Sequence, residues 1–501
     1  MTFETEKKRP PAAEAADAKP ASHDTVNPPA LIDFMMKRWK PQARALPKPL
    51  ANAAAFRRRR AQLSKLFEGV ALVVPTGHEK VRANDTYYRF RPGSDFFYLT
   101  GNPEPDCVLV MVPRYGGGHD AHLFVEPNPG RGSETFYTDR KKGELWVGPR
   151  LGVEQSGARY GVDAAHALGD LQGFLENHVG ARVLRGLSPS TDALVAAPPA
   201  PPEPPAETPA PPDRDAELAT ALSELRLQKD AAEVKELKKV IGATRRGFED
   251  VIRSLKGARS EREVEGVFGL RARVEGQDVG YGTIAAAGAH ACVLHWTHND
   301  GALRRSELLL LDAGIEGHQL YTADITRTLP IGGKFSKEQR EIYTLVYQAQ
   351  RAALAAVKPG HDFMEPNRRA MRVLADGLER LGILENADEA MKDEHQFYKR
   401  YSLHNVSHML GLDVHDCAKA RQENYKYGAL KPGMVLTIEP GLYFQVDDLT
   451  VPAKYRGIGV RIEDDVLVTA KGVQNLSASI PAAPDDVERW MAAVWKSPKK
   501  K

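Results

Sequence analysis

The sequence predicts an α/β protein with two domains, and three observations support this. The chain has 501 residues, more than one hydrophobic core usually serves. Short apolar runs alternate with segments of helical periodicity, as they do in α/β folds. A proline-rich stretch, residues 196–213, separates the two halves. Because proline at this density favours extended chain and cannot build a core, we interpret the stretch as a loop or linker.

The composition argues against several classes of protein. The 69 basic and 66 acidic residues leave a net charge of +3, too small to indicate a nucleic-acid partner. No apolar run is long enough to cross a bilayer, and the first residues lack the apolar core of a secretory signal. The three cysteines lie far apart, so we expect buried thiols and no disulfide framework. These features predict a cytoplasmic protein that binds neither nucleic acid nor membrane.

The first half of the chain is predicted to contain a disordered tail, residues 1–28, and one domain, residues 29–220. The tail is rich in proline, alanine, lysine and glutamate. In the domain, four apolar runs predict strands, with a glycine-rich hairpin loop between the last two, and helical patterns alternate with apolar runs after them. The four runs are residues 69–77, 96–101, 107–113 and 121–127.

The second half is predicted to be a separate domain, residues 221–485, with a carboxy-terminal tail, residues 486–501. A long segment of helical periodicity begins it. Ser336 and Gln339 have the spacing of a capping box and predict the start of another helix. Beyond this helix, strands recur with acidic residues at their ends.

These acidic residues are unusual because the strands that carry them are predicted to be buried. Asp312 ends a run of four leucines, and Asp324 interrupts an apolar stretch twelve residues later. Glu439 ends another apolar strand, and Glu463 shares a strand face with Arg461. An ionised carboxylate is costly to bury without a positive partner. We expect Arg461 to orient Glu463 through a charge-assisted hydrogen bond.

Two divalent cations would balance four crowded carboxylates, some of which would otherwise become protonated. The stretch "HNVSHMLGLDVHD" adds His404, His408 and His415 nearby in the sequence. Carboxylate oxygens with one imidazole suit Mn²⁺ or a similar ion. Taken singly, however, each acid is better explained as an exposed strand end or a helix cap. Spacing alone does not bring the residues to one point.

The motifs resemble those of the pita-bread metallopeptidases, specifically aminopeptidase P and its relative prolidase. Five motifs in the same order carry the resemblance over residues 225–480. It extends into the first half through "NDTYYRFRPGSDFFYLTGNPEP" (84–105) and "ELWVGPRLG" (144–152). The resemblance implies a creatinase-like α/β domain followed by a pita-bread catalytic domain. It also implies a homo-oligomer, either a dimer or a tetramer.

Carried over residue by residue, the resemblance implies a site with two metal ions. Asp324 and Glu463 would bridge the ions, Asp312 would bind one of them, and His408 with Glu439 would bind the other. Mn²⁺ is the expected metal, with Co²⁺ or Zn²⁺ as alternatives. Glu439 would also act as general base on the bridging water.

The resemblance assigns further catalytic and substrate-binding residues, including Arg461 beside the metal ligands. His295 and His404 would hydrogen-bond the tetrahedral intermediate or move protons, and His415 would contact the scissile carbonyl. Tyr443 would help to fix the surrounding side chains. Trp146 matches a tryptophan that lines the pocket of a neighbouring subunit in the family, with packing in its own domain as the alternative.

The implied activity is hydrolysis of the bond between an N-terminal residue and a following proline, by a hydroxide that two metal ions activate. The substrates are then peptides with proline at the second position. Prolidase, which splits Xaa-Pro dipeptides, is the alternative, and the long first domain favours the aminopeptidase. A metal-free binding protein of the same fold is a further alternative, which the complete set of five ligands disfavours.

Overall fold

The computed structural model describes residues 27–40, 45–178, 180–195 and 213–497. Nearly all of the predicted disordered tail and the proline-rich stretch therefore lie outside the described residues. The chain divides into two compact units, Met1–Ala216 and Glu217–Lys501, and each is described by itself. The boundary predicted from the sequence was residue 220.

The first unit contains short helices and one main sheet. Its elements are α1 (Pro29–Met35), α2 (Ala53–Ser64), β1 (Leu72–Pro75), β2 (Val81–Ala83), β3 (Thr86–Tyr87), α3 (Ser94–Thr100), β4 (Val108–Pro113), β5 (His119–Val125), α4 (Thr135–Thr138), α5 (Glu144–Val147), α6 (Val153–Tyr160), β6 (Ala164–Ala167), α7 (Leu171–Leu175), β7 (Arg182–Val183) and α8 (Pro189–Leu194). The sheet has the strand order β6-β5-β4-β1-β7. Its three central strands are antiparallel, and β6 and β7 join its edges in parallel.

Residues 96–101, predicted to be a strand, form instead the end of helix α3 and its C-cap, Gly101. The helix ends at Gly101, whose φ of 69° is a left-handed conformation that glycine adopts without strain. All side chains from Phe96 to Thr100 are buried. A helix buried on every side has no polar face, so its sequence lacks the periodicity that separates a helix from a strand. The other three predicted strands are confirmed as β1, β4 and β5.

The second unit is larger, and its short strands are covered by long helices. Its main elements are α9 (Arg214–Arg226), α10 (Ala231–Ser254), α11 (Glu261–Glu275), β8 (Asp278–Val279), β9 (Ile284–Ala287), β10 (Leu308–Asp312), β11 (Ile315–Glu316), β12 (Thr326–Pro330), α12 (Lys337–Ala356), α13 (Glu365–Arg380), α14 (Ala387–Met391), β13 (Val435–Ile438), β14 (Gly441–Tyr443), β15 (Gly459–Arg461), β16 (Asp464–Thr469), β17 (Gly472–Asn475) and α15 (Pro484–Lys496).

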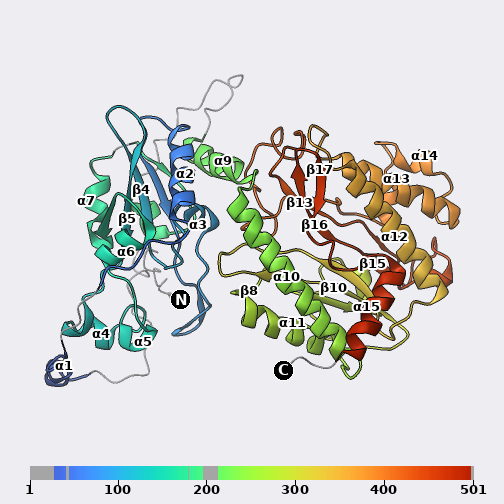
Figure 1. The fold of residues 1–501 in the computed structure, drawn as a ribbon, viewed down its shortest axis with the longest axis horizontal. Helices are drawn as coiled ribbons and strands as arrows, with labels where there is room; N and C mark the ends of the chain where they lie inside the picture. The colour runs from blue at the N-terminus through green and yellow to red at the C-terminus, as the bar shows by residue number, and fades with distance from the viewer. Residues whose placement is uncertain (1–26, 41–44, 179, 196–212, 498–501) are drawn as a thin grey trace, which may run out of the picture. The chain divides into compact units, whose positions relative to one another are not determined.

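The strands of this unit form small antiparallel sheets, including β12-β10-β9, β13-β16-β17 and β14-β15. Helix α10 packs against α11 and α15, and α12 packs against α13 (Figure 1). One continuous apolar core fills the space between helices and sheets. The predicted capping box begins α12. The backbone amide of Gln339 donates to Ser336 Oγ at 3.2 Å, and the backbone amide of Ser336 donates to Gln339 Oε1 at 2.9 Å.

The segment predicted to be a carboxy-terminal tail, residues 486–501, is mostly helix α15. Apolar residues at helical spacing are buried along one side of it, including Val487, Met491 and Val494. Pro484 lies at the start of the helix, where its missing N–H is harmless, and aspartates occupy the first turn. The tail prediction was therefore wrong for residues 486–496. Residues 498–501 lie outside the described part of the chain.

Two predictions from composition concern features of the described residues, membrane-spanning helices and cysteines. None of the helices there has the length and apolar character that spanning a bilayer requires. All three cysteines are free and buried, as predicted.

Candidate metal centre

Two pairs of strands bring four acidic residues to one place. In the antiparallel pair of β10 and β12, Asp312 lies opposite Thr326. Asp324 lies two residues before Thr326 and is therefore close to Asp312. Antiparallel pairing of β13 with β16 puts Glu439, which follows β13, beside Glu463, which precedes β16. The Glu463 amide donates to the carbonyl of Thr326 at 3.0 Å, which joins the two pairs.

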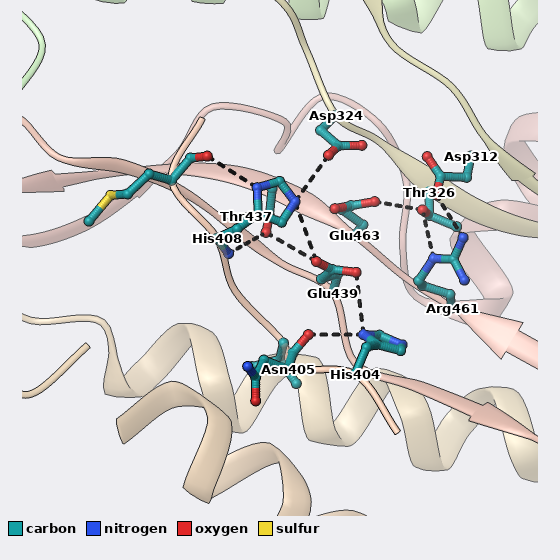
Figure 2. Close-up of polar contacts among 12 residues, drawn as sticks. Asp312, Asp324, Thr326, His404, Asn405, His408, Thr437, Glu439, Arg461 and Glu463 are labelled. Carbon is teal, nitrogen blue, oxygen red and sulfur yellow. Dashed lines mark hydrogen bonds and ion pairs between the residues drawn. The ribbon is translucent and has the colours of Figure 1, made fainter. Parts of the chain in front are cut away.

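A loop alongside β13 adds an imidazole to the acids. The Thr437 amide donates to the carbonyl of His408 at 3.0 Å. Nε2 of His408 then lies 3.3 Å from Asp324 Oδ2 and 3.5 Å from Glu439 Oε1. Ligand atoms of Asp324, His408 and Glu463 all lie within 4.8 Å of one another. Figure 2 shows these side chains turned toward a common centre.

Burial changes the proton affinities of the cluster. It raises the pKa of Glu463 well above its usual value, and the charges of Asp324 and Glu439 raise it further. Burial also raises the pKa of Asp312, and it raises that of Glu439 to about 7. For His408, burial disfavours the charged ring, but the hydrogen bond with Asp324 and the charge of Glu439 raise its pKa to about 9. Protons or metal ions must therefore neutralise this cluster.

Arg461 contacts Asp312 and not its predicted partner, Glu463. Its Nη2 donates to Asp312 Oδ2 at 2.7 Å, and its Nη1 donates to the Tyr443 hydroxyl at 2.9 Å. Glu463 Oε2 instead accepts from Thr326 Oγ1 at 2.6 Å. The prediction failed because strand alternation gives the face on which a residue lies, but not the neighbouring sheet that supplies its partner.

The donor set fits divalent metal ions. All five predicted ligands line one cavity of about 580 Å³. Carboxylate oxygens with a single imidazole match the ligand preference of Mn²⁺ and similar ions. The converging atoms of Asp324, His408 and Glu463 would hold one ion, and Asp312 and Glu439 complete the wall around them.

Two family models match this chain. The model of metallopeptidase family M24 matches residues 235–470, and that of the aminopeptidase P N-terminal domain matches residues 56–184. Xaa-Pro aminopeptidase 1 of Streptomyces coelicolor is 49% identical, over 93% of this chain and 92% of the relative. The chain belongs to metallopeptidase family M24.

Other M24 relatives extend the likeness to both units. Xaa-Pro aminopeptidase of Escherichia coli is 33% identical, over 88% of this chain and 98% of the relative. A solved structure of aminopeptidase P from E. coli, a low-pH form, matches with a TM-score of 0.78 and 33% identity, over 89% of this chain and 99% of that chain. The predicted fold, a creatinase-like α/β domain followed by a pita-bread domain, is confirmed.

The histidines predicted around the M24 metal site line the same cavity. His295, His404 and His415 all contribute to its wall. Burial lowers the pKa of His415, and so does the charge of His408, whose ring centre is 4.4 Å away. A neutral imidazole at this place can donate an N–H to a substrate oxygen without carrying a charge into the cavity.

His404 is held by Tyr443. The Tyr443 hydroxyl accepts from Arg461, so it is able to donate its own hydrogen to His404 Nε2, 2.7 Å away. Nδ1 of His404 lies 2.9 Å from the Asn405 carbonyl, which can only accept, and this places the proton on Nδ1. Burial, together with the charge of Arg461, lowers the pKa of His404 to about 4. His404 is therefore neutral at pH 7.

Sequence reasoning missed Tyr281, which contacts two of the acids. Its hydroxyl lies 2.7 Å from Asp312 Oδ1 and 2.5 Å from Asp324 Oδ1, and its single hydrogen can serve only one of them at a time. The residue precedes strand β9 between Gly280 and Gly282. A Cβ at Gly280 would lie 1.8 Å from a threonine side chain, so the flanking glycine was the available signal.

Trp146 lies in the first unit, and its contacts are made within that unit. Its indole N–H donates to the Tyr137 carbonyl at 2.7 Å, and the Arg140 guanidinium lies 4.7 Å from its ring centre. The side chain is 48% exposed. This packing satisfies the polar atom of the indole and leaves one side of the ring open. A role of Trp146 in a neighbouring subunit's pocket stays a prediction.

Proposed function

We propose that the protein is an Xaa-Pro aminopeptidase, which hydrolyses the bond between an N-terminal residue and a following proline. The proposal depends mainly on one observation: the five predicted ligands and three histidines line the same cavity. Relatives named Xaa-Pro aminopeptidases, aligned over about nine-tenths of the chain, support this substrate class.

The proposed metal ligands would hold two divalent ions. The proposed ligands are Asp312, Asp324, His408, Glu439 and Glu463. When bound, such ions lower the pKa of a water and polarise a carbonyl oxygen. The chain's own contribution is to keep the ligands converged inside a cavity, where electrostatic interactions are stronger than in water.

Proton transfer is proposed to run through Glu439, with the His404 ring beside it. Glu439 would accept a proton from the attacking water as general base. Its Oε2 lies 3.5 Å from His404 Nδ1, and Nε2 of the same ring contacts the Tyr443 hydroxyl at 2.7 Å. The proline nitrogen leaves as a secondary amine and must gain a proton. Glu439 would return to this nitrogen the proton that it took from the water, while the Nδ1–H of His404 stabilises the carboxylate.

His295 and His415 are proposed to bind the reacting carbonyl. Both line the cavity with the metal ligands. An N–H directed at the carbonyl oxygen stabilises the negative charge that develops there in the transition state. Glu439 would then transfer the proton, with His404 beside it, while His295 and His415 orient the substrate.

The test of the proposal is a peptide panel. Purified protein is assayed on an Xaa-Pro-Xaa tripeptide, an Xaa-Pro dipeptide and an Xaa-Ala-Xaa tripeptide. We expect release of the N-terminal residue from the Xaa-Pro-Xaa peptide and none from the alanine control. Cleavage of the dipeptide alone would make the protein a prolidase, the alternative that the sequence leaves open.

Metal identity, assembly and location complete the proposal. We favour Mn²⁺ because of the oxygen-rich donor set, to be checked by metal analysis of protein purified without added metal. Zinc is included in that analysis because one solved structure of the E. coli relative is a Zn-substituted form. A homodimer or homotetramer is proposed, to be checked by light scattering, and a cytoplasmic location by cell fractionation.

A further inference from the structure

One fully buried carboxylate outside the cavity wall has four hydrogen-bond donors. Glu261 is the first residue of α11, and its exposed fraction is 0%. Its Oε1 accepts from the Ala287 amide at 2.7 Å and lies 2.8 Å from His290 Nδ1. Its Oε2 accepts from the Trp296 indole at 2.8 Å and from the Gly301 amide at 2.7 Å. Removing this acceptor would leave several donors without a partner.

All four donors belong to residues 287–301, the segment that carries His295. Leu294, His295 and Thr297 line the cavity, whereas Trp296 between them donates to Glu261. The Trp296 ring also stacks on His290, with ring centres 3.9 Å apart. Neighbouring residues thus face opposite ways: His295 lines the cavity, and Trp296 donates a hydrogen bond to Glu261.

Asn299 provides a second set of hydrogen bonds that limits how this segment can rearrange. Asn299 is fully buried, accepts from the Ala285 amide at 2.9 Å and donates to the Thr283 carbonyl at 2.8 Å. Its φ of 47° is a left-handed conformation that few residues other than glycine adopt. At Gly301, an added Cβ would lie 2.7 Å from the His290 ring. The segment is therefore held on both sides of Trp296, at His290 and at Asn299, while the His295 side chain between them stays exposed.

The position of Glu261 also explains how a charge can be buried without a Lys or Arg partner. It lies in the first turn of α11, where the helix dipole favours a negative charge. Two backbone amides and an indole N–H donate to it as well. Hydrogen bonds to an ionised acceptor are among the strongest that proteins make.

We propose that Glu261 is a positioning residue that acts through His295. It anchors the segment 287–301 so that the His295 ring faces the reacting carbonyl. The inference rests on the proposed function, because it assumes that His295 contacts the substrate. A shift of the order of 1 Å in such a group lowers the rate about 100-fold, with less effect on substrate binding.

The first test is the variant Glu261→Gln, which keeps the shape of the side chain and removes its charge. We expect kcat on an Xaa-Pro-Xaa peptide to fall about 10- to 100-fold, while KM and the metal bound per chain stay close to wild type. The matched control is Glu488→Gln. Glu488 is also a buried carboxylate, held by Lys334 at 2.7 Å and the Phe335 amide at 3.0 Å, and it does not line the cavity. The Glu488→Gln variant should lower the melting temperature and leave kcat unchanged.

A double-mutant cycle tests whether Glu261 acts through His295. His295→Gln is measured alone and together with Glu261→Gln. If the carboxylate works by placing this ring, the double variant should be no slower than His295→Gln. Effects on kcat that multiply would overturn the proposal, as would a Glu261→Gln variant with wild-type kcat.

Hydrogen exchange of the full-length protein tests the anchor without using activity. Glu261→Gln should speed amide exchange in residues 287–301, and Glu488→Gln should not. Unchanged exchange in that segment would overturn the proposal. If the wild type cleaves no Xaa-Pro peptide, the proposed function fails, and exchange alone decides whether Glu261 holds the segment. If Glu261→Gln does not fold, Trp296→Phe removes one donor, keeps an aromatic ring on His290, and should show the same effects at smaller size.

Discussion

Nη2 of Arg461 lies 2.7 Å from Oδ2 of Asp312, and the two side chains are 4% and 11% exposed. The same guanidinium donates to the Tyr443 hydroxyl, which in turn contacts His404. A permanent cation therefore connects one proposed metal ligand to His404, the histidine beside the proposed general base. This connection means that a change at Arg461 should affect both metal binding and catalysis.

Arg461→Lys should lower kcat/KM and metal affinity, by about 10- to 100-fold for a residue that orients a ligand. A lysine ammonium cannot reproduce the planar fork that reaches Asp312 and Tyr443 together. Peptide hydrolysis and a metal titration measure the two effects. Arg246→Lys is the control, because Arg246 pairs with Glu275 at a half-exposed position. Wild-type metal affinity and rate in Arg461→Lys would contradict the prediction.

Glu463→Gln should have opposite effects on the metal-free and metal-loaded protein. It replaces an acid whose charge is costly in this cluster with a neutral side chain and keeps an oxygen that accepts from Thr326. In chelator, the melting temperature should rise by about 2 °C, because the change relieves charge repulsion. Added Mn²⁺ should then raise it less than in wild type. A melting temperature in chelator below that of wild type would count against a repulsive cluster.

Removal of the metal should abolish hydrolysis and lower the melting temperature. Dialysis against a chelator leaves the four acids without the ions that neutralise them, so both signals should return when Mn²⁺ is added. Activity on an Xaa-Pro-Xaa peptide and thermal unfolding provide the readouts. Magnesium added at the same concentration is the control for a general salt effect. Full activity after exhaustive chelation would exclude a metal-dependent reaction.

Asp416→Asn should destabilise the protein by about 3–5 kcal/mol, because it leaves the buried Lys229 without its carboxylate partner and leaves Arg226 with Asp413 but not Asp416. Asp416 Oδ1 accepts from Arg226 at 2.5 Å, and its Oδ2 lies 3.0 Å from Lys229 Nζ. Burial opposes ionisation, but the charges of Arg226 and Lys229 hold the pKa of Asp416 at about 2. Denaturant unfolding at pH 7 measures the loss.

The same group predicts a direction for the pH dependence of stability. In the unfolded chain an aspartate has a pKa of about 3.9, above the folded value. Asp416 therefore stabilises the fold fully above about pH 4, and this stability is lost as the pH falls toward 2. Asp416→Asn should show a shallower loss of stability than wild type over this range. Equal slopes would show that Asp416 does not contribute.

Much of the fold followed from patterns between neighbours in the sequence. The capping box at Ser336 and Gln339 depends on residues three apart, and the acids at Asp312 and Glu439 end or follow runs that form strands β10 and β13. Such signals are local, and they are present whatever the rest of the chain does. The placement of Asp324 and Glu463 near them needed the family resemblance, because spacing along the chain does not give distances across sheets.

Local patterns failed where burial is complete or where partners come from another sheet. Helix α3 is buried all round and was mistaken for a strand, and α15 was mistaken for a tail although its apolar residues have helical spacing. The amino-acid order by itself specified which residue types stand at the strand ends and therefore which chemistry is present. The packing of separate sheets determined that Arg461 pairs with Asp312 and that Tyr281 joins two acids. Hydrogen bonds between residues far apart in the chain depend on the relative position of whole elements, and no short stretch of sequence encodes that position.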